Sequence, residues 1–171
     1  MRRTRPIEKR GSVYITPDGF ESLKTEYSQL WIHRRDVTKH LAAAAAEGDR
    51  SENAEYHYRK KQLREIDRRI RYLQKRLDEL VVVVQKPSDS TRIFFGAWVQ
   101  LEDAQNERRI YRIVGADEFD VKKGYISLDS PVARSLINKK IDDEVTVELP
   151  NGVEVLYIVA VSYSPIIVEN Q

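Results

Sequence analysis

The run Leu63-Arg-Glu-Ile-Asp-Arg-Arg-Ile-Arg-Tyr-Leu-Gln-Lys-Arg-Leu-Asp-Glu-Leu80 decides the fold of the first half of the chain. Its apolar residues recur at alternating steps of three and four, as Leu63, Ile66, Ile70, Leu73, Leu77 and Leu80, and Val84 continues the spacing. This period places them on one stripe of an α-helix. The rest of the run is charged, so the stripe needs a second helix to cover it.

A matching stripe lies upstream. Thr16-Pro17 predicts a helix start, with an N-cap followed by proline at the first helical position. The apolar positions that follow are Phe20, Leu23, Tyr27, Leu30, Val37, Leu41 and Ala44, with Arg34 in one seam position. Gly48 ends the run, and the two stripes cover each other only if the chain folds back. We therefore expect a flexible basic arm at 1–15 and an antiparallel coiled-coil hairpin at 16–86, with arms of about 45 Å.

Beyond a linker at 87–91 the apolar period becomes two, which is typical of strands. The alternating sets are Ala97, Val99 and Leu101; Val145, Val147 and Leu149; and Val153, Val155, Tyr157, Val159 and Val161. Asn151-Gly152 favours a type I′ hairpin turn, and Ser130-Pro131 favours a short helix from Val132 to Asn138. We expect an α+β domain with a mainly antiparallel sheet at 92–165 and a tail at 166–171.

Composition limits the possible functions. The 171 residues are 41% apolar and 33% charged, with a net charge of only +2. The absence of cysteine excludes disulfides, thiolate zinc sites and cysteine nucleophiles. No apolar run reaches the roughly 18 residues of a membrane span. The basic N-terminus lacks the apolar centre of a signal peptide. We expect a soluble cytoplasmic protein that does not bind membranes.

Two acids stand between the helices, in Gly48-Asp-Arg-Ser-Glu-Asn-Ala-Glu-Tyr56. Asp49 and Glu52 are three apart, which fits a capping box with Asp49 as N-cap and Glu52 as its partner. The same pair also fits half of a Mg²⁺ site, because Mg²⁺ is often held by one or two carboxylates plus ligands from elsewhere. Both interpretations stay open. Ser51 has no histidine base in reach and is not expected to be a nucleophile.

The second helix carries a basic stretch. Residues 59–76 hold nine cations against Glu65 and Asp67, a net +7. The cations are Arg59, Lys60, Lys61, Arg64, Arg68, Arg69, Arg71, Lys75 and Arg76. A solvated coiled-coil face is the ordinary explanation, but such faces usually mix both signs. The one-signed stretch favours contact with nucleic-acid phosphates.

The segment 48–56 closely resembles the hairpin tip of the bacterial Gre transcript-cleavage factors. Further segments are similar to the GreB branch of that family: Leu63 to Leu73, Phe94-Phe-Gly-Ala-Trp-Val99, and Tyr125-Ile-Ser-Leu-Asp-Ser-Pro-Val-Ala-Arg134. Thr16-Pro-Asp-Gly-Phe20 resembles the start of the family, and the likeness covers roughly 16–165. The basic extension before Thr16 is longer than is usual in the family.

The resemblance implies an FKBP-like C-terminal domain that grips RNA polymerase through Asp129, Ser130 and Pro131. It implies that the coiled coil enters the secondary channel of the polymerase and reaches the 3′ end of backtracked nascent RNA. Asp49 and Glu52 would hold the second catalytic Mg²⁺ of the polymerase, with Ser51 and Asn53 as supporting neighbours. The polymerase itself would cut the RNA, so the protein would be a monomeric cofactor protein and not an enzyme.

Three other readings of the residues remain open. A nucleic-acid-gripping helical arm would need the basic stretch but not the acids. A prolyl isomerase or chaperone would follow from the fold alone, which does not establish activity. A channel-binding regulator without cleavage stimulation would share the shape, although the intact pair of Asp49 and Glu52 argues against it.

Overall fold

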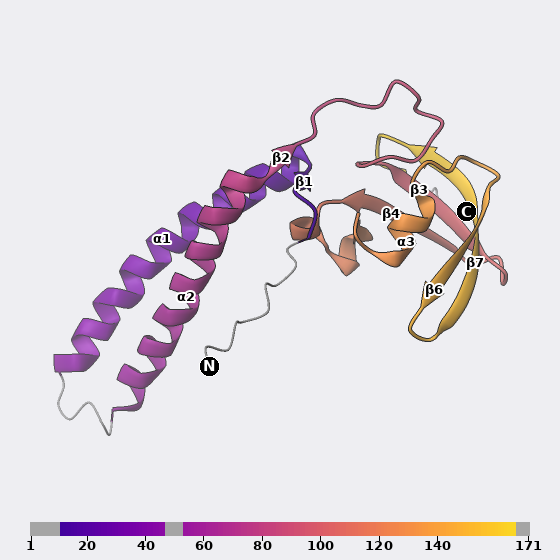
Figure 1. Cartoon of the computed structure of the whole chain (residues 1–171). Coiled ribbons are helices and arrows are strands. Elements are labelled where there is room, and N and C mark those ends of the chain that lie inside the picture. The colour runs from indigo at the N-terminus through magenta and orange to yellow at the C-terminus, as the bar shows by residue number, and fades with distance from the viewer. Residues whose placement is uncertain (1–10, 47–52, 167–171) are drawn as a thin grey trace, which may run out of the picture. The chain divides into compact units, whose positions relative to one another are not determined.

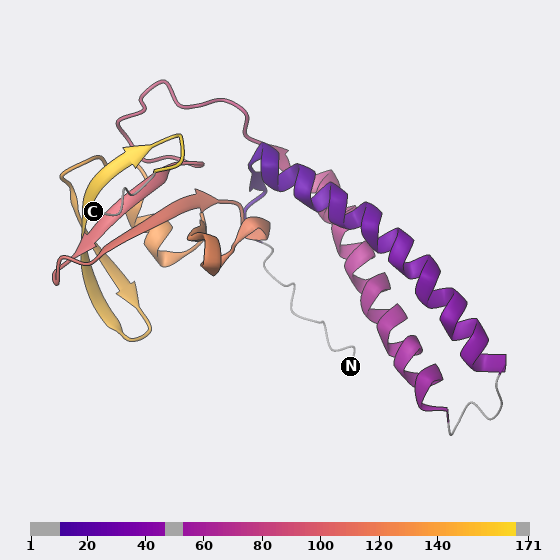
Figure 2. The same cartoon turned by 180° about the vertical axis from the view of Figure 1, so that it is seen from behind.

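The computed structural model describes residues 11–46 and 53–166. The chain forms two compact units. One is the helical segment 20–80, and the other combines the N-terminal residues to Gly19 with the residues from Val81 onward. Figures 1 and 2 show a helical hairpin and a curled sheet, as expected from the sequence.

The hairpin consists of α1 (Pro17–Ala46) and α2 (Ala54–Glu79), which run side by side in opposite directions in both views (Figures 1 and 2). The Thr16 hydroxyl oxygen accepts the N–H of Gly19 at 3.1 Å, which confirms the expected N-cap. The two stripes meet as expected. Their buried residues include Val37, Ile66 and Ile70, with Tyr27, Leu30 and Leu63 packed around them.

The helical stripe ends earlier than expected. After Glu79 the backbone is extended, and β2 (Val81–Val82) pairs in parallel with β1 (Tyr14–Ile15). Val84, the last expected seam residue, is 75% exposed. Four consecutive β-branched valines disfavour helix and favour strand, which explains the change. Tyr14 and Ile15 thus belong to a strand, whereas residues 1–10 of the expected arm lie outside the described residues.

The C-terminal sheet has five strands in the order β5-β4-β3-β7-β6, antiparallel except for the parallel pair β4 and β5. The strands are β3 (Trp98–Asp103), β4 (Arg108–Val114), β5 (Tyr125–Ser127), β6 (Glu144–Leu149) and β7 (Gly152–Ser162). Two 3₁₀ turns, Ala116–Glu118 and Val121–Lys123, join β4 to β5. The expected inward set of β3 is confirmed, since Ala97, Val99 and Leu101 are buried.

The last hairpin differs from the sequence prediction. Leu149 pairs with Gly152, so the connecting residues are Pro150 and Asn151. A type I′ turn needs positive φ at both central residues, and proline fixes φ near −65°. The positive φ lies instead at Gly152, at 134°.

The inward face of β7 also differs from the expected one. Leu156 and Ile158 are buried, whereas Val153 and Tyr157 are exposed. The register with β3 shifts between Gln100 and Leu101, which pair with Ala160 and Ile158. The extra residue in β7 is a bulge that reverses the alternation, so the period of two does not hold along the whole strand.

The first turn of α1 is anchored within the C-terminal unit. The Glu118 carboxylate accepts the backbone N–H of Thr16 at 3.0 Å, the Thr16 hydroxyl, and the N–H of Gly115 at 2.9 Å. A side chain at Gly19 would overlap that carboxylate. Glu118 therefore fixes the residue that caps α1.

Candidate functional site

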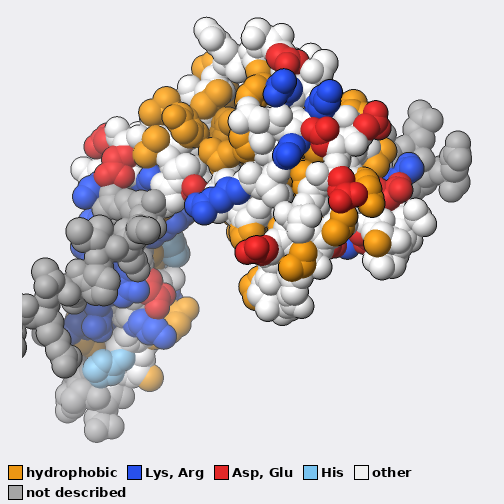
Figure 3. Space-filling view, turned by 45° about the vertical axis from the view of Figure 1, so that its right-hand side comes forward, with side chains coloured by type: hydrophobic (Ala, Val, Ile, Leu, Met, Phe, Trp, Pro, Cys, Tyr) orange, Lys and Arg blue, Asp and Glu red, His pale blue; other side chains and the backbone are white. Residues whose placement is uncertain are grey.

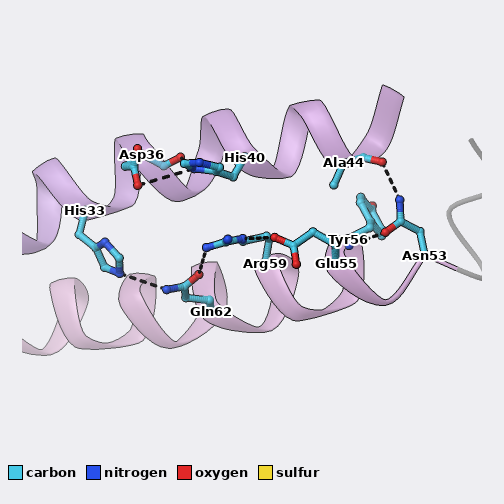
Figure 4. Close-up of polar contacts among 9 residues, drawn as sticks. All are labelled: His33, Asp36, His40, Ala44, Asn53, Glu55, Tyr56, Arg59 and Gln62. Carbon is cyan, nitrogen blue, oxygen red and sulfur yellow. Dashed lines mark hydrogen bonds and ion pairs between the residues drawn. The ribbon is translucent and has the colours of Figure 1, made fainter. Parts of the chain in front are cut away.

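The described part of the hairpin tip is organised by Asn53 (Figure 4). Its side-chain nitrogen donates to the carbonyl oxygen of Ala44 at 2.8 Å, and its side-chain oxygen accepts the N–H of Tyr56 at 3.0 Å. Asn53 has extended backbone (φ −87°, ψ 97°) and is the N-cap of α2. One side chain therefore serves the last turns of α1 and the first turn of α2.

This geometry corrects one interpretation of the tip acids. α2 begins at Ala54 with Asn53 as its cap, so the capping box with Asp49 as N-cap and Glu52 as its partner is wrong. Asn and Asp cap helices about equally well, and spacing alone did not separate the two positions. Asp49, Ser51 and Glu52 themselves lie outside the described residues.

A chain of polar contacts extends from the tip along the hairpin (Figure 4). Arg59 donates to Glu55 at 2.7 Å and to the side-chain oxygen of Gln62 at 3.2 Å. The Gln62 amide lies 3.2 Å from Nε2 of His33 on α1. Arg59 is thus held by neighbours on its own helix, which leaves it less free to bind RNA than the sequence indicates.

The structure divides the basic stretch into two groups. Arg69 makes a two-point contact with Glu26 at 2.7 and 2.8 Å, and Arg76 is buried, with Nη1 3.9 Å from Glu79. Arg59 is paired with Glu55. The other six cations are exposed, and within the described residues they form no ion pair with a carboxylate: Lys60, Lys61, Arg64, Arg68, Arg71 and Lys75.

We call Lys61, Arg64, Arg68, Arg71 and Lys75 the basic stripe. Their spacing of three, four, three and four places them along one side of α2. Figure 3 shows Lys and Arg side chains gathered over the hairpin. An exposed row of this kind has the charge and spacing to hold successive phosphates.

The expected docking segment is a structured turn in the C-terminal unit. Ser130 caps α3 (Pro131–Leu136) by accepting the N–H of Ala133 at 3.1 Å. The Asp129 carboxylate accepts the N–H of Ser12 at 2.6 Å. The helix ends at Leu136, two residues before its expected end at Asn138, whose φ is 67°. Both Asp129 and Ser130 thus have structural partners, and Pro131 is exposed.

The described residues form neither a metal-holding cluster nor a membrane-spanning helix. The described ranges contain no group of three or more His, Asp or Glu side chains arranged to hold a metal ion. No described helix has the length and apolar character needed to span a membrane.

Two family descriptions match this chain and together cover most of it. Residues 13–82 match the N-terminal domain of transcription elongation factors, and residues 87–163 match the C-terminal domain of the GreA/GreB transcription elongation factors. The chain therefore belongs to the GreA/GreB family of transcription elongation factors.

Its relatives point to one branch of that family. It is 54% identical to the transcription elongation factor GreB of Xanthomonas axonopodis pv. citri over 96% of this chain and 99% of the relative. It is 50% identical to GreB of Pseudomonas aeruginosa, with the same coverage. GreB of Yersinia pestis is 54% identical over 90% of this chain and 91% of the relative. The sequence is thus of the GreB type.

The solved structures that match this chain are more distant in sequence. Gfh1 of Thermus thermophilus is 24% identical, covers 88% of this chain and 99% of its own, and has a TM-score of 0.41. A GreA/GreB factor from Nitrosomonas europaea is 19% identical, covers 89% of this chain and all of its own, and also has a TM-score of 0.41.

Proposed function

We propose that this GreB-type elongation factor stimulates RNA polymerase to cleave its own backtracked transcript. The observation that carries the proposal is the hydrogen bond from the Asn53 side chain to the Ala44 carbonyl oxygen. It joins the residues on either side of the segment that contains Asp49 and Glu52. Since Asn53 caps α2, neither acid is needed as its N-cap. Capping of α2 therefore does not compete with metal binding by these two acids.

Asp49 and Glu52 would bind Mg²⁺ that is also held by the polymerase. When bound, the ion lowers the pKa of a coordinated water and stabilises charge on the phosphate oxygens. Two carboxylates supply a minority of the six oxygens that Mg²⁺ prefers. The isolated chain should therefore neither hold the ion firmly nor cut RNA, and the cleavage chemistry belongs to the polymerase.

The remaining parts have separate roles in this proposal. The basic stripe on α2 contacts phosphates of the extruded RNA, with Lys60 beside it. The C-terminal unit docks on the polymerase through the turn at Asp129, Ser130 and Pro131. We expect the free protein to be a monomer that acts in the cytoplasm.

The test is to add the purified protein to a stalled, backtracked elongation complex in Mg²⁺ and to resolve the RNA fragments released from the 3′ end. Release should require both the polymerase and this protein. Fragments formed without polymerase at the same Mg²⁺ concentration would show nuclease activity in the chain itself. An unchanged transcript would leave a channel-binding regulator as the better description.

A further inference from the structure

A groove on α1 lies outside every site described above. It has a volume of about 390 Å³ and is lined by Trp31, Arg34, Arg35, Thr38 and Lys39. Trp31 is 44% exposed, although tryptophan side chains are on average highly buried. The groove therefore combines an accessible aromatic ring with three cations.

The indole at this groove is held in place by its neighbours. The Arg34 guanidinium lies 5.7 Å from the ring centroid and donates to Asp67 of α2 at 2.6 Å. Tyr27 packs edge-on against the indole, with ring centroids 6.4 Å apart and an interplanar angle of 85°. A ring fixed this way and still exposed is a preorganised stacking surface.

The groove and the basic stripe lie on the same side of the hairpin. Residues seven apart share one side of a helix. Glu26 and His33 contact Arg69 and Gln62, which defines one flank of the hairpin. Trp31 and Thr38 are also seven apart and occupy the other flank, where Arg34 meets Asp67.

The flank that bears the groove carries charge of one sign. On α2, the basic-stripe residues Arg64 and Arg71 each lie four residues after Lys60 and Asp67, the residues of this flank, and are therefore their neighbours on the helix surface. Within residues 31–39 and 60–75, Asp67 is the only acidic residue at the helix positions that face this flank. Its charge is neutralised by Arg34. Arg35 and Lys39 are exposed and have no carboxylate partner among the described residues. Both helices therefore contribute cations to one continuous face.

We propose that this face binds single-stranded RNA across both helices, with a base stacked on Trp31 and phosphates held by Arg35 and Lys39. The choice of RNA as the partner rests on the proposed function. The α1 residues extend the RNA interface beyond the basic stripe on α2. Cations interleaved with an exposed aromatic ring fit a strand with anionic phosphates and flat bases. An acidic protein surface would match the cations and leave the indole without a role.

The experiment uses Trp31 as its own reporter. The chain has two tryptophans, so Trp98→Phe leaves Trp31 alone. A short oligouridylate at low salt should quench Trp31 emission as it binds. The reciprocal Trp31→Phe protein, which retains Trp98, should bind the RNA less tightly and show no quenching. In the Trp98→Phe background, Arg35→Glu with Lys39→Glu should weaken the RNA affinity about tenfold or more, because the charge that contacts a phosphate is reversed at two positions.

The matched control is Lys122→Glu with Lys123→Glu, which changes the net charge equally but in the C-terminal unit. It should leave the RNA affinity nearly unchanged. Unchanged Trp31 emission at RNA concentrations that saturate binding by anisotropy would overturn the proposal. The proposal would also be overturned if the Arg35→Glu/Lys39→Glu protein kept normal RNA affinity and bound the polymerase less tightly. That result would assign the face to a protein partner. Fragment release by the unmodified protein tests the proposed function separately.

Discussion

The side-chain nitrogen of Asn53 lies 2.8 Å from the carbonyl oxygen of Ala44, nine residues earlier in the chain (Figure 4). The last four carbonyls of a helix lack partners within it, as do the first four N–H groups. Asn53 meets both needs, because its amide donates to a carbonyl near the end of α1 and accepts an N–H of α2. An aspartate or serine could cap α2 but could not make both contacts in the same way.

This relationship predicts a specific effect of Asn53→Asp. The variant keeps an acceptor for the Tyr56 N–H but places a carboxylate oxygen against the Ala44 carbonyl. Loss of the donor in a half-buried site should lower the free energy of unfolding by about 1–2 kcal/mol. Fragment release should fall while polymerase binding is retained. Urea unfolding and the cleavage assay measure both, and full cleavage by a destabilised variant would limit Asn53 to a role in stability.

The tip acids are tested by Asp49→Ala and Glu52→Ala. Each should abolish most fragment release and leave polymerase binding nearly unchanged, since docking is assigned to the C-terminal unit. Asp49→Asn is the informative companion, because it removes the charge with little change in shape and Asn53, not residue 49, caps α2. Full activity of Asp49→Asn would rule out a metal-binding role for that carboxylate.

The basic stripe is tested by Arg64→Glu with Arg68→Glu. If the stripe holds phosphates along its length, the defect should be greater for long extruded RNA than for short RNA. Arg69→Gln is a control on the same helix, because Arg69 is already engaged by Glu26. It should affect cleavage little and stability by less than about 1 kcal/mol. Equal losses on long and short RNA would assign the stripe to docking or folding.

Periodicity predicted the hairpin because a stripe of apolar residues has only one way to be covered in an isolated pair of helices. It failed where one local event changes the pattern. A single extra residue in β7 exchanges the buried and exposed sets, and no residue type marks that position. Val84 kept the helical spacing, although the helix ends at Glu79 and the first two valines of its run form β2.

The site was less predictable than the fold for a related reason. Asn53 was expected only as a neighbour of the acids, yet Asn directly before Ala54 is itself a helix-start signal that identifies the cap. Its bond to Ala44 depends on the distance between two helices, which spacing along one helix does not contain. The groove beside Trp31 was missed because its cations become one face with those of α2 only after the two helices pair.

A pH-dependent prediction concerns Asp103, at the end of β3. Its carboxylate accepts the N–H groups of Glu107 and Gln105, each at 2.9 Å, and contacts Arg109 at 2.7 Å. The Glu107 N–H, followed by that of Gln105 and the Arg109 guanidinium, lowers the pKa of Asp103 below its usual 3.8. The resulting stabilisation is present above the unfolded pKa and is lost as pH falls through the lower, folded value.

Asp103→Asn should therefore be less stable than the unmodified protein at pH about 7, and the difference should shrink in acid, below pH about 4. Urea unfolding of both proteins across this range measures it. Glu148→Gln alters an exposed carboxylate of β6 and should show a much smaller difference at neutral pH. A gap between the Asp103→Asn and unmodified proteins that stays constant with pH would show that the carboxylate charge is not responsible.

The last prediction separates docking from folding at Asp129. The carboxylate accepts the Ser12 N–H at 2.6 Å, so Asp129→Ala removes a structural bond as well as any polymerase contact. Loss of one half-buried hydrogen bond should lower the free energy of unfolding by about 1 kcal/mol. If Asp129 also touches the polymerase, binding should weaken by more than this small destabilisation explains.

Ser12→Pro supplies the matched control, because proline lacks the backbone N–H that donates to Asp129 and the Asp129 carboxylate is retained. Both proteins should lose similar stability in urea, whereas only Asp129→Ala should bind the polymerase less tightly. Ser130→Ala adds a second comparison, since it removes the cap of α3 and leaves the Asp129 carboxylate in place. Equal binding losses in Asp129→Ala and in Ser12→Pro would mean that the bond between residues 12 and 129 matters, and not a contact made by Asp129. The docking surface would then have to lie elsewhere on residues 92–165.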